Sequence, residues 1–198
     1  MLLTTTLGCG FHFIIKQRAK IENGEIHWCD ETGFRSDNQG LRGYSPKGKT
    51  PVLKQSGSRL SLNMISSITN QGKLGFKIYE SSMNAELFIE FLRQVIKSSE
   101  KKVFMIVDNL RVHHANMVRE WVDLNINSIE IFYIPPYSPE LNPDEYLNCD
   151  VKTNANSKRM PRSKEELREN IQSHMEMLHE KPDRIKSYFE NRFIQYAS

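Results

Sequence analysis

Five consecutive apolar residues, Val103 to Val107, restrict the fold of this chain more than any other segment. A run of this length without a polar interruption predicts a strand that is buried on both faces. A second run, from Ile129 to Ile134, has the same character. Strands of this kind need helices on both sides of their sheet, so the two runs predict an α/β domain.

The pattern elsewhere supplies the elements around these two strands. Further strands are expected at 25–30, 60–69 and 73–79, with a hairpin turn at Asn70-Gln71-Gly72 between the last two. Helices are expected at 84–95, 115–124, 143–152, 163–178 and, as a last amphipathic segment, 182–196. Asn84 can cap the first of these helices, and Ser163 with Glu166 forms a capping box. Residues 31–59, rich in Gly, Ser, Pro and cations, are expected to form a loop or a loose hairpin. The order of elements predicts a mixed sheet flanked by helices.

Composition narrows the class of protein. The 198 residues suffice for one domain, and 38% hydrophobic with 26% charged residues is typical of a folded globular chain. No apolar stretch reaches the roughly 18–20 residues of a membrane span, and the first ten residues lack the basic region of a signal peptide. Cys9, Cys29 and Cys149 form neither a disulfide framework nor a metal-binding pair, which favours a reducing cytosol. A net charge of +3 leaves a polyanionic partner open.

Three acidic residues follow elements that the fold can bring together. Asp30 closes the strand at 25–30, Asp108 closes the run from Val103, and Glu145 follows a proline-rich stretch. Carboxylates are the ligands that Mg²⁺ and Mn²⁺ prefer, and two such ions can drive the in-line displacement that cuts or joins a phosphodiester. Each pair of carboxylates about 4 Å apart costs roughly 4 kcal/mol at an effective dielectric of about 20. Such a cluster is therefore tolerated where metal binds it or where one member stays protonated. Taken singly, each acid could equally be a turn former or a helix cap.

The residues around these acids resemble a known family. The segments are Ile26-His27-Trp28-Cys29-Asp30-Glu31-Thr32-Gly33, Val107-Asp108-Asn109 followed by His113, and Pro135-Pro136-Tyr137-Ser138-Pro139-Glu140-Leu141-Asn142-Pro143-Asp144-Glu145. Together they are similar to the three acidic motifs of bacterial insertion-sequence transposases related to the mariner elements, the IS-six-thirty group. The third motif is the most specific, and the 36 residues between Asp108 and Glu145 are close to that group's spacing. The resemblance implies a ribonuclease H-like fold with a five-stranded mixed sheet. It covers residues 15–198 as a DDE transposase catalytic domain, with residues 1–14 as an atypical N-terminal segment.

Carried over residue by residue, the resemblance makes Asp30, Asp108 and Glu145 the catalytic residues and the ligands of two Mg²⁺ or Mn²⁺ ions. Asp144 is a rival for the third place, because it is adjacent and acidic. Neighbours on a helix point about 100° apart, so only one can face the metals. The family motif has its acid two residues after Pro143, which selects Glu145.

Other polar residues near the motifs have weaker claims to a function. Asp150 lies further along the same helix and is interpreted as structural or as a support of the site. Glu31 points to the opposite face from Asp30 if the strand continues, so a supporting or capping role is expected. His113 or His114 could touch a phosphate or the nucleophile, although tandem histidines at a helix start are more often surface or capping residues.

Aromatic and basic residues could contact DNA. Trp28 and Trp121 are expected in the core rather than as stacking platforms. Two sets of cations could follow a DNA backbone or could simply be solvated. They are Arg35, Arg42, Lys47, Lys49, Lys54 and Arg59, and Lys152, Lys158, Arg159, Arg162 and Lys164.

The resemblance implies a cut-and-paste DNA transposase that acts on transposon ends and target DNA. It would work in the bacterial cytoplasm at the nucleoid, with no membrane, and it admits a homodimer. Transposases of this group usually carry helix-turn-helix modules ahead of the catalytic domain, so we expect a truncated or frameshifted product, or half of a split reading frame. The alternatives are a non-catalytic DNA-binding or regulatory remnant and a small structure-selective nuclease.

Overall fold

A five-stranded mixed sheet forms the centre of the molecule. The computed structural model describes residues 2–35, 48, 60–135, 141–155, 161–191, 194 and 197, with side chains from residue 12 onward. The strands are β1 (Glu25–Arg35), β2 (Ser61–Ile68), β3 (Leu74–Tyr79), β4 (Val103–Val107) and β5 (Ile129–Tyr133). They lie in the order β3-β2-β1-β4-β5. The pairs β3–β2 and β2–β1 are antiparallel, and the pairs β1–β4 and β4–β5 are parallel. The predicted mixed α/β sheet is confirmed.

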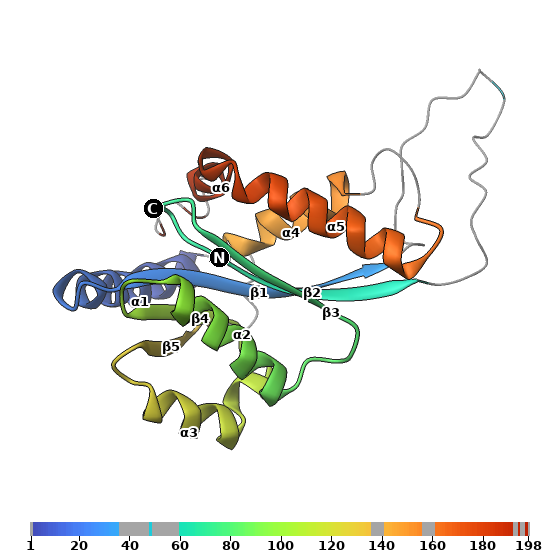
Figure 1. Cartoon of the computed structure of the whole chain (residues 1–198). Coiled ribbons are helices and arrows are strands. Elements are labelled where there is room, and N and C mark those ends of the chain that lie inside the picture. Colours follow the sequence, from blue (N-terminus) through green and yellow to red (C-terminus); the bar gives the residue numbers. More distant parts are fainter. Residues whose placement is uncertain are drawn as a thin grey trace.

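Helices cover both faces of this sheet, as Figure 1 shows. They are α1 (Leu2–Ile21), α2 (Ala85–Ser98), η1 (Arg111–His114), α3 (Asn116–Leu124), α4 (Asp144–Asn154), α5 (Lys164–His179), α6 (Pro182–Ser187) and η3 (Tyr188–Glu190). One face packs against α4, α5 and α6, and the other against α2 and α3. In the part of the chain that is described, no helix has the length and apolar character needed to cross a bilayer.

Local signals located most of these elements correctly. The apolar run Val103–Val107 is β4, and all five of its residues are buried. The Asn84 side chain accepts a hydrogen bond from the Leu87 N–H at 2.9 Å, and Ser163 Oγ accepts one from the Glu166 N–H at 3.1 Å, as the predicted caps require. The turn glycine, Gly72, has a φ of 91°, a conformation that other residues rarely adopt.

Two segments differ from the prediction. The loop expected from residue 31 begins later, because β1 continues to Arg35 and pairs with β2 as far as Ser61. The amphipathic segment expected at 182–196 is the short helix α6 followed by one 3₁₀ turn, and residues 192–193 and 195–196 lie outside the described residues. The basic segment 36–59, apart from Gly48, also lies outside them.

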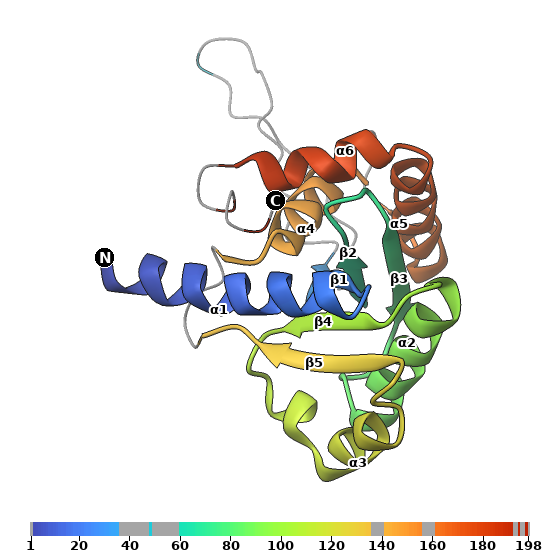
Figure 2. The same cartoon turned by 90° about the vertical axis from the view of Figure 1, so that its left-hand side faces the viewer.

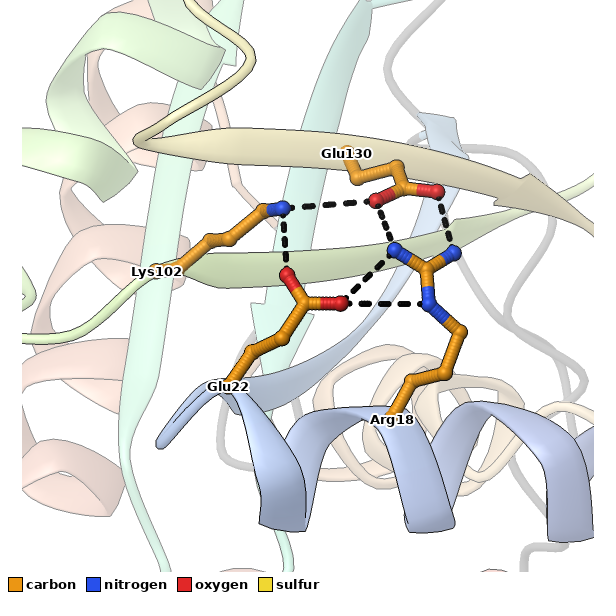
Figure 3. Close-up of polar contacts among 4 residues, drawn as sticks. All are labelled: Arg18, Glu22, Lys102 and Glu130. Atoms are coloured by element: carbon orange, nitrogen blue, oxygen red, sulfur yellow. Dashed lines mark hydrogen bonds and ion pairs between the residues drawn. The ribbon is translucent and has the colours of Figure 1, made fainter.

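The N-terminal helix α1 was not predicted, and it spans both sides of the boundary expected between residues 14 and 15. Its N-terminal turns reach beyond the sheet in Figure 2. Ile15 and Ala19 are buried against the sheet, and a network of ion pairs fixes the last turns (Figure 3). Arg18 donates to both carboxylate oxygens of Glu130 at 2.6 and 2.7 Å. It also donates to Glu22 at 2.8 Å, and Lys102 donates to Glu22 at 2.7 Å. The network joins α1 to the starts of β4 and β5.

The start of β1 packs closely on β4 at Gly24. A Cβ atom at this position would lie 2.3 Å from the Phe104 ring and 3.1 Å from the Lys102 carbonyl oxygen. Gly24→Ala is therefore expected to lower the free energy of unfolding by about 1–3 kcal/mol, the usual cost of overpacking. Urea unfolding measures this change. Gly33→Ala is the matched control, because its nearest neighbour, Asn63 Oδ1, would be 3.3 Å away. Equal stability of the two variants would mean that β1 and β4 do not pack in this way.

Candidate active site

Two of the predicted acids lie at the same level of the sheet. The parallel register pairs Trp28 with Ile106, and Asp30 and Asp108 each follow two residues later. Neighbouring strands lie about 4.8 Å apart, so this register brings the two strand ends side by side. Asp30 is still within β1, where it pairs with Ser66 of β2, whereas Asp108 follows the last residue of β4.

Asp30 is held by α4 and influenced by both other predicted acids. Its Oδ2 accepts a hydrogen bond from Asn148 Nδ2 at 2.8 Å. Burial, followed by the negative charges of Glu145 and Asp108, raises the pKa of Asp30 to about 7. The carboxylates of Glu145 and Asp108 are therefore close enough to Asp30 to disfavour its ionised form.

Asp108 is paired with a buried histidine. His113 Nδ1 lies 3.1 Å from Asp108 Oδ1, and its Nε2 lies 3.1 Å from Glu31 Oε1. The Leu110 N–H also donates to Asp108 Oδ1, at 3.1 Å. Burial alone would raise the pKa of Asp108, but these two donors lower it below its usual value. Burial would likewise lower the pKa of His113, yet hydrogen bonds to Asp108 and Glu31 raise it to about 9.

The two acids at the start of α4 have opposite environments. Asp144 is fully buried, and its Oδ2 accepts a hydrogen bond from Ser66 Oγ at 3.0 Å. No described group donates to its Oδ1, and burial with the nearby charge of Asp30 raises its pKa well above the usual value. Glu145 is exposed. Asp144 therefore points into the protein, while Glu145, the next residue, is open to solvent.

Asn142 fixes this end of α4 against β1. Its Nδ2 donates to the Cys29 carbonyl at 3.0 Å, and its Oδ1 accepts from the Asp144 N–H at 3.1 Å. The segment just before it, residues 136–140, carries much of the third motif and lies outside the described residues.

The charges of four carboxyl groups act on the buried thiol of Cys29. Burial, followed by the charges of Asp144, Glu31, Asp30 and Asp108, raises the pKa of Cys29 well above its ordinary value. The acids come from β1, from the end of β4 and from α4. The fold therefore concentrates negative charge at this end of the sheet, and His113 lies among these acids as a counter-charge.

The histidine prediction was wrong in part. His113 is buried, with 2% of its surface exposed, and it is not a surface residue. It lies in η1 rather than at the start of α3. His114 stacks on Tyr133 with ring centroids 4.1 Å apart and contacts Asn109 Oδ1 at 3.1 Å.

The other predicted residues have structural roles where they are described. Asp150 accepts hydrogen bonds from Asn154, His174, Arg184 and Tyr188, and so ties α4 to α5, α6 and η3. Trp28 is 3% exposed in the core, and Trp121 packs partly buried beside α2. Lys164 pairs with Glu80, and Lys152 and Arg162 are exposed. Lys158 and Arg159 lie outside the described residues.

Sequence reasoning missed three residues that hold the acids in place: Ser66, Asn142 and Asn148. Asn148 lies four residues after Asp144, so helical spacing alone puts both on one face of α4. Asn142 lies inside the third motif, which makes it recognisable. No local signal distinguishes Ser66.

The acids suit divalent cations that bind oxygen. Among the described residues, no three His, Cys, Asp or Glu side chains already enclose a single point. Mg²⁺ does not need such a cage, because it usually takes one or two carboxylates and completes its shell with water and substrate phosphates. Burial and, after it, the charges of Glu145 and Asp108 disfavour the ionised form of Asp30, and a bound cation would offset this cost. Asp30, Asp108 and Glu145 therefore fit such a site.

The raised pKa of Asp30 predicts how stability depends on pH. An acid with a folded pKa near 7 and an unfolded pKa near 3.8 binds more protons when folded, so metal-free stability falls as pH rises from about 4 to 7. Asp30→Asn removes this contribution and keeps an acceptor for Asn148. Above pH 7 the variant is expected to be more stable than the parent by on the order of 3 kcal/mol, with a flatter dependence below. Chemical unfolding of both proteins without metal, from pH 4 to 8, measures the difference. A constant difference over this range would contradict the raised pKa of Asp30.

Comparison with known proteins identifies the family and the fold of this chain. Residues 25–168 match the family described as DDE superfamily endonuclease. A pre-cleavage Mos1 transpososome has a TM-score of 0.66 at 15% identity, covering 98% of this chain and 63% of the Mos1 chain. The Mos1 transposase paired-end complex with left transposon end has a TM-score of 0.64 at 16% identity, covering 98% and 62%. The catalytic domain of Mos1 mariner transposase has a TM-score of 0.57 at 14% identity, covering 97% and 92%. No curated protein matches significantly.

The chain thus spans less than two thirds of the Mos1 chains in these complexes. At such identities the likeness shows the fold, and the expected ribonuclease H-like architecture is confirmed. The family match covers well over half of the sequence. This protein therefore belongs to the DDE superfamily of endonucleases.

Proposed function

We propose that this chain is the catalytic domain of a DNA transposase, which hydrolyses a phosphodiester at a transposon end and joins the 3′-hydroxyl to target DNA. One observation carries the proposal: the parallel register of β1 and β4 brings Asp30 and Asp108 to the same level of the sheet, and α4, the helix that carries Glu145, holds Asp30 through Asn148. Membership of the DDE endonucleases and the fold shared with Mos1 transposase complexes support it. Mos1 structures are described with Mg and with Mn, which supports the same ions here.

In this proposal Asp30, Asp108 and Glu145 hold the divalent ions. Two bound Mg²⁺ or Mn²⁺ ions would activate the attacking oxygen and stabilise the leaving oxygen. Asn148 orients one oxygen of Asp30, and the Leu110 N–H with His113 orients one oxygen of Asp108. Glu145 has the exposure that contact with a DNA phosphate requires, whereas Asp144 has no open side. We therefore assign the third position to Glu145.

The finer assignments belong to the same proposal. The quoted motifs support the bacterial IS-six-thirty group, with residues 15–198 as the catalytic domain. DNA is the proposed partner, as transposon end and target, and two copies are proposed to act together as a homodimer. The free thiols of Cys29 and Cys149 are compatible with action in the reducing bacterial cytoplasm at the nucleoid.

A plasmid-nicking assay tests the chemistry. With Mn²⁺ or Mg²⁺ the protein is expected to nick supercoiled DNA slowly and with little sequence preference, and EDTA should stop the reaction. Asp108→Asn and Glu145→Gln should reduce nicking to the level measured in EDTA, because each removes a charged ligand. Asp144→Asn should retain metal-dependent nicking, because that side chain is buried against Ser66 and has no open side.

Glu120→Gln is the matched control, since Glu120 is an exposed acid on α3, away from the acid cluster. Loss of nicking in Asp144→Asn with activity retained in Glu145→Gln would transfer the third role to Asp144. If no protein nicks DNA under any metal condition while all bind it, the non-catalytic DNA-binding remnant becomes the better description.

A further inference from the structure

His113 connects the two acid-bearing strand ends at a point where their backbones no longer pair. The parallel β1–β4 ladder ends at Trp28 and Ile106. Beyond it, Glu31 of β1 and Asp108 after β4 are bridged only by the imidazole, among the described residues. Each ring nitrogen lies 3.1 Å from one carboxylate oxygen.

The protein holds this imidazole from several sides. His113 is 2% exposed, and its ring packs on Phe88 with centroids 4.4 Å apart. Tyr133 Oη donates to its backbone carbonyl at 3.1 Å, and its own N–H donates to the Leu110 carbonyl at 3.0 Å. Its Nδ1 also lies 3.2 Å from the Asp108 carbonyl. Both nitrogens face acceptors, so the ring acts as a double donor with a fixed orientation.

As a result, the two carboxylate oxygens of Asp108 have different surroundings. Oδ1 accepts a hydrogen bond from the Leu110 N–H and lies 3.1 Å from His113 Nδ1 as an ion pair, while the same ring nitrogen contacts the Asp108 carbonyl. No described group donates to Oδ2. The side chain of Asp108 is 42% exposed, so solvent can reach it. The carboxylate is therefore fixed through one oxygen and offers the other to solvent.

We propose that His113, braced by Glu31, is a positioning residue that fixes Asp108 so that Oδ2 is the oxygen available to a divalent cation. This inference rests on the proposed function, because it assumes that Asp108 binds the ion. Groups that orient a metal ligand through a hydrogen bond typically change metal affinity 10–100-fold when removed.

The two amide side chains separate positioning from simple packing. An Asn amide nitrogen occupies roughly the place of His Nδ1, and a Gln amide nitrogen that of Nε2. His113→Asn thus keeps the donor toward Asp108, and His113→Gln keeps only the donor toward Glu31. If the residue merely filled space, Gln, which is closer to His in size, would substitute at least as well as Asn.

Isothermal titration of the full chain with Mn²⁺ tests the proposal, with the melting temperature of each metal-free variant measured beside it. His113→Ala is expected to weaken Mn²⁺ binding at least about tenfold. His113→Asn should recover most of the affinity, and His113→Gln should recover less. Glu31→Gln should weaken Mn²⁺ binding by a smaller factor, because it removes only the negative charge that holds His113 Nε2.

His179→Gln is the matched control, since it alters an exposed histidine at the end of α5 whose ion-pair partner is Glu180, and its affinity should equal that of the parent. If His113→Ala does not fold, the Asn and Gln variants still decide the question. Parental Mn²⁺ affinity in the His113 variants, with only the melting temperature lowered, would overturn the inference and leave the proposed function intact. A parent that binds no Mn²⁺, or binds it equally well after Asp108→Asn, would overturn both.

Discussion

The parallel register between β1 and β4 brings two carboxylates to one level of the sheet, since Trp28 pairs with Ile106 and each acid follows two residues later. The other residues of the site are positioned relative to these two strand ends. β4 can take this central place because all five of its residues are apolar and buried between the two helical layers. Gly24 permits close packing of β1 on Phe104, and the ion pairs of α1 hold the starts of β4 and β5. Packing at the start of β1 and β4 thus stabilises the sheet whose other end carries the acidic residues.

That concentration is unfavourable unless something compensates it, and the structure supplies only part of the compensation. His113 balances Asp108 and Glu31, and burial beside Ser66 raises the pKa of Asp144, which favours its uncharged form. Asp30 is left with a pKa near 7, so its charge is not fully accommodated in the protein alone. A fold that keeps this arrangement loses stability as long as no further positive charge compensates Asp30. The α4 helix is meanwhile fixed independently, because Asp150 joins it to α5, α6 and η3.

Local sequence patterns correctly predicted the elements that depend on interactions between neighbouring residues. The strand at Val103–Val107, the caps at Asn84 and Ser163 and the turn at Gly72 follow from residues next to one another. The features that were not predicted depend on contacts between segments far apart in the sequence. Strand β1 continues through Glu31 because β2 pairs with it, and α1 forms where Arg18 meets Glu130, 112 residues away. His113 is buried by contact with Glu31, 82 residues away, and Asp144 turns inward toward Ser66, 78 residues away. The acids themselves were recognisable from the motifs, but the contacts that hold them in place were not.

Manganese has an anomalous X-ray signal that identifies its position directly, so diffraction from crystals grown with Mn²⁺ tests the central claim. Anomalous peaks are expected at the carboxyl ends of β1 and β4, within coordination distance of Asp30, Asp108 and Glu145, with Asp144 still buried against Ser66. Peaks confined to other parts of the surface, or ions bound by Asp144 with Glu145 turned away, would contradict the assignment of this site.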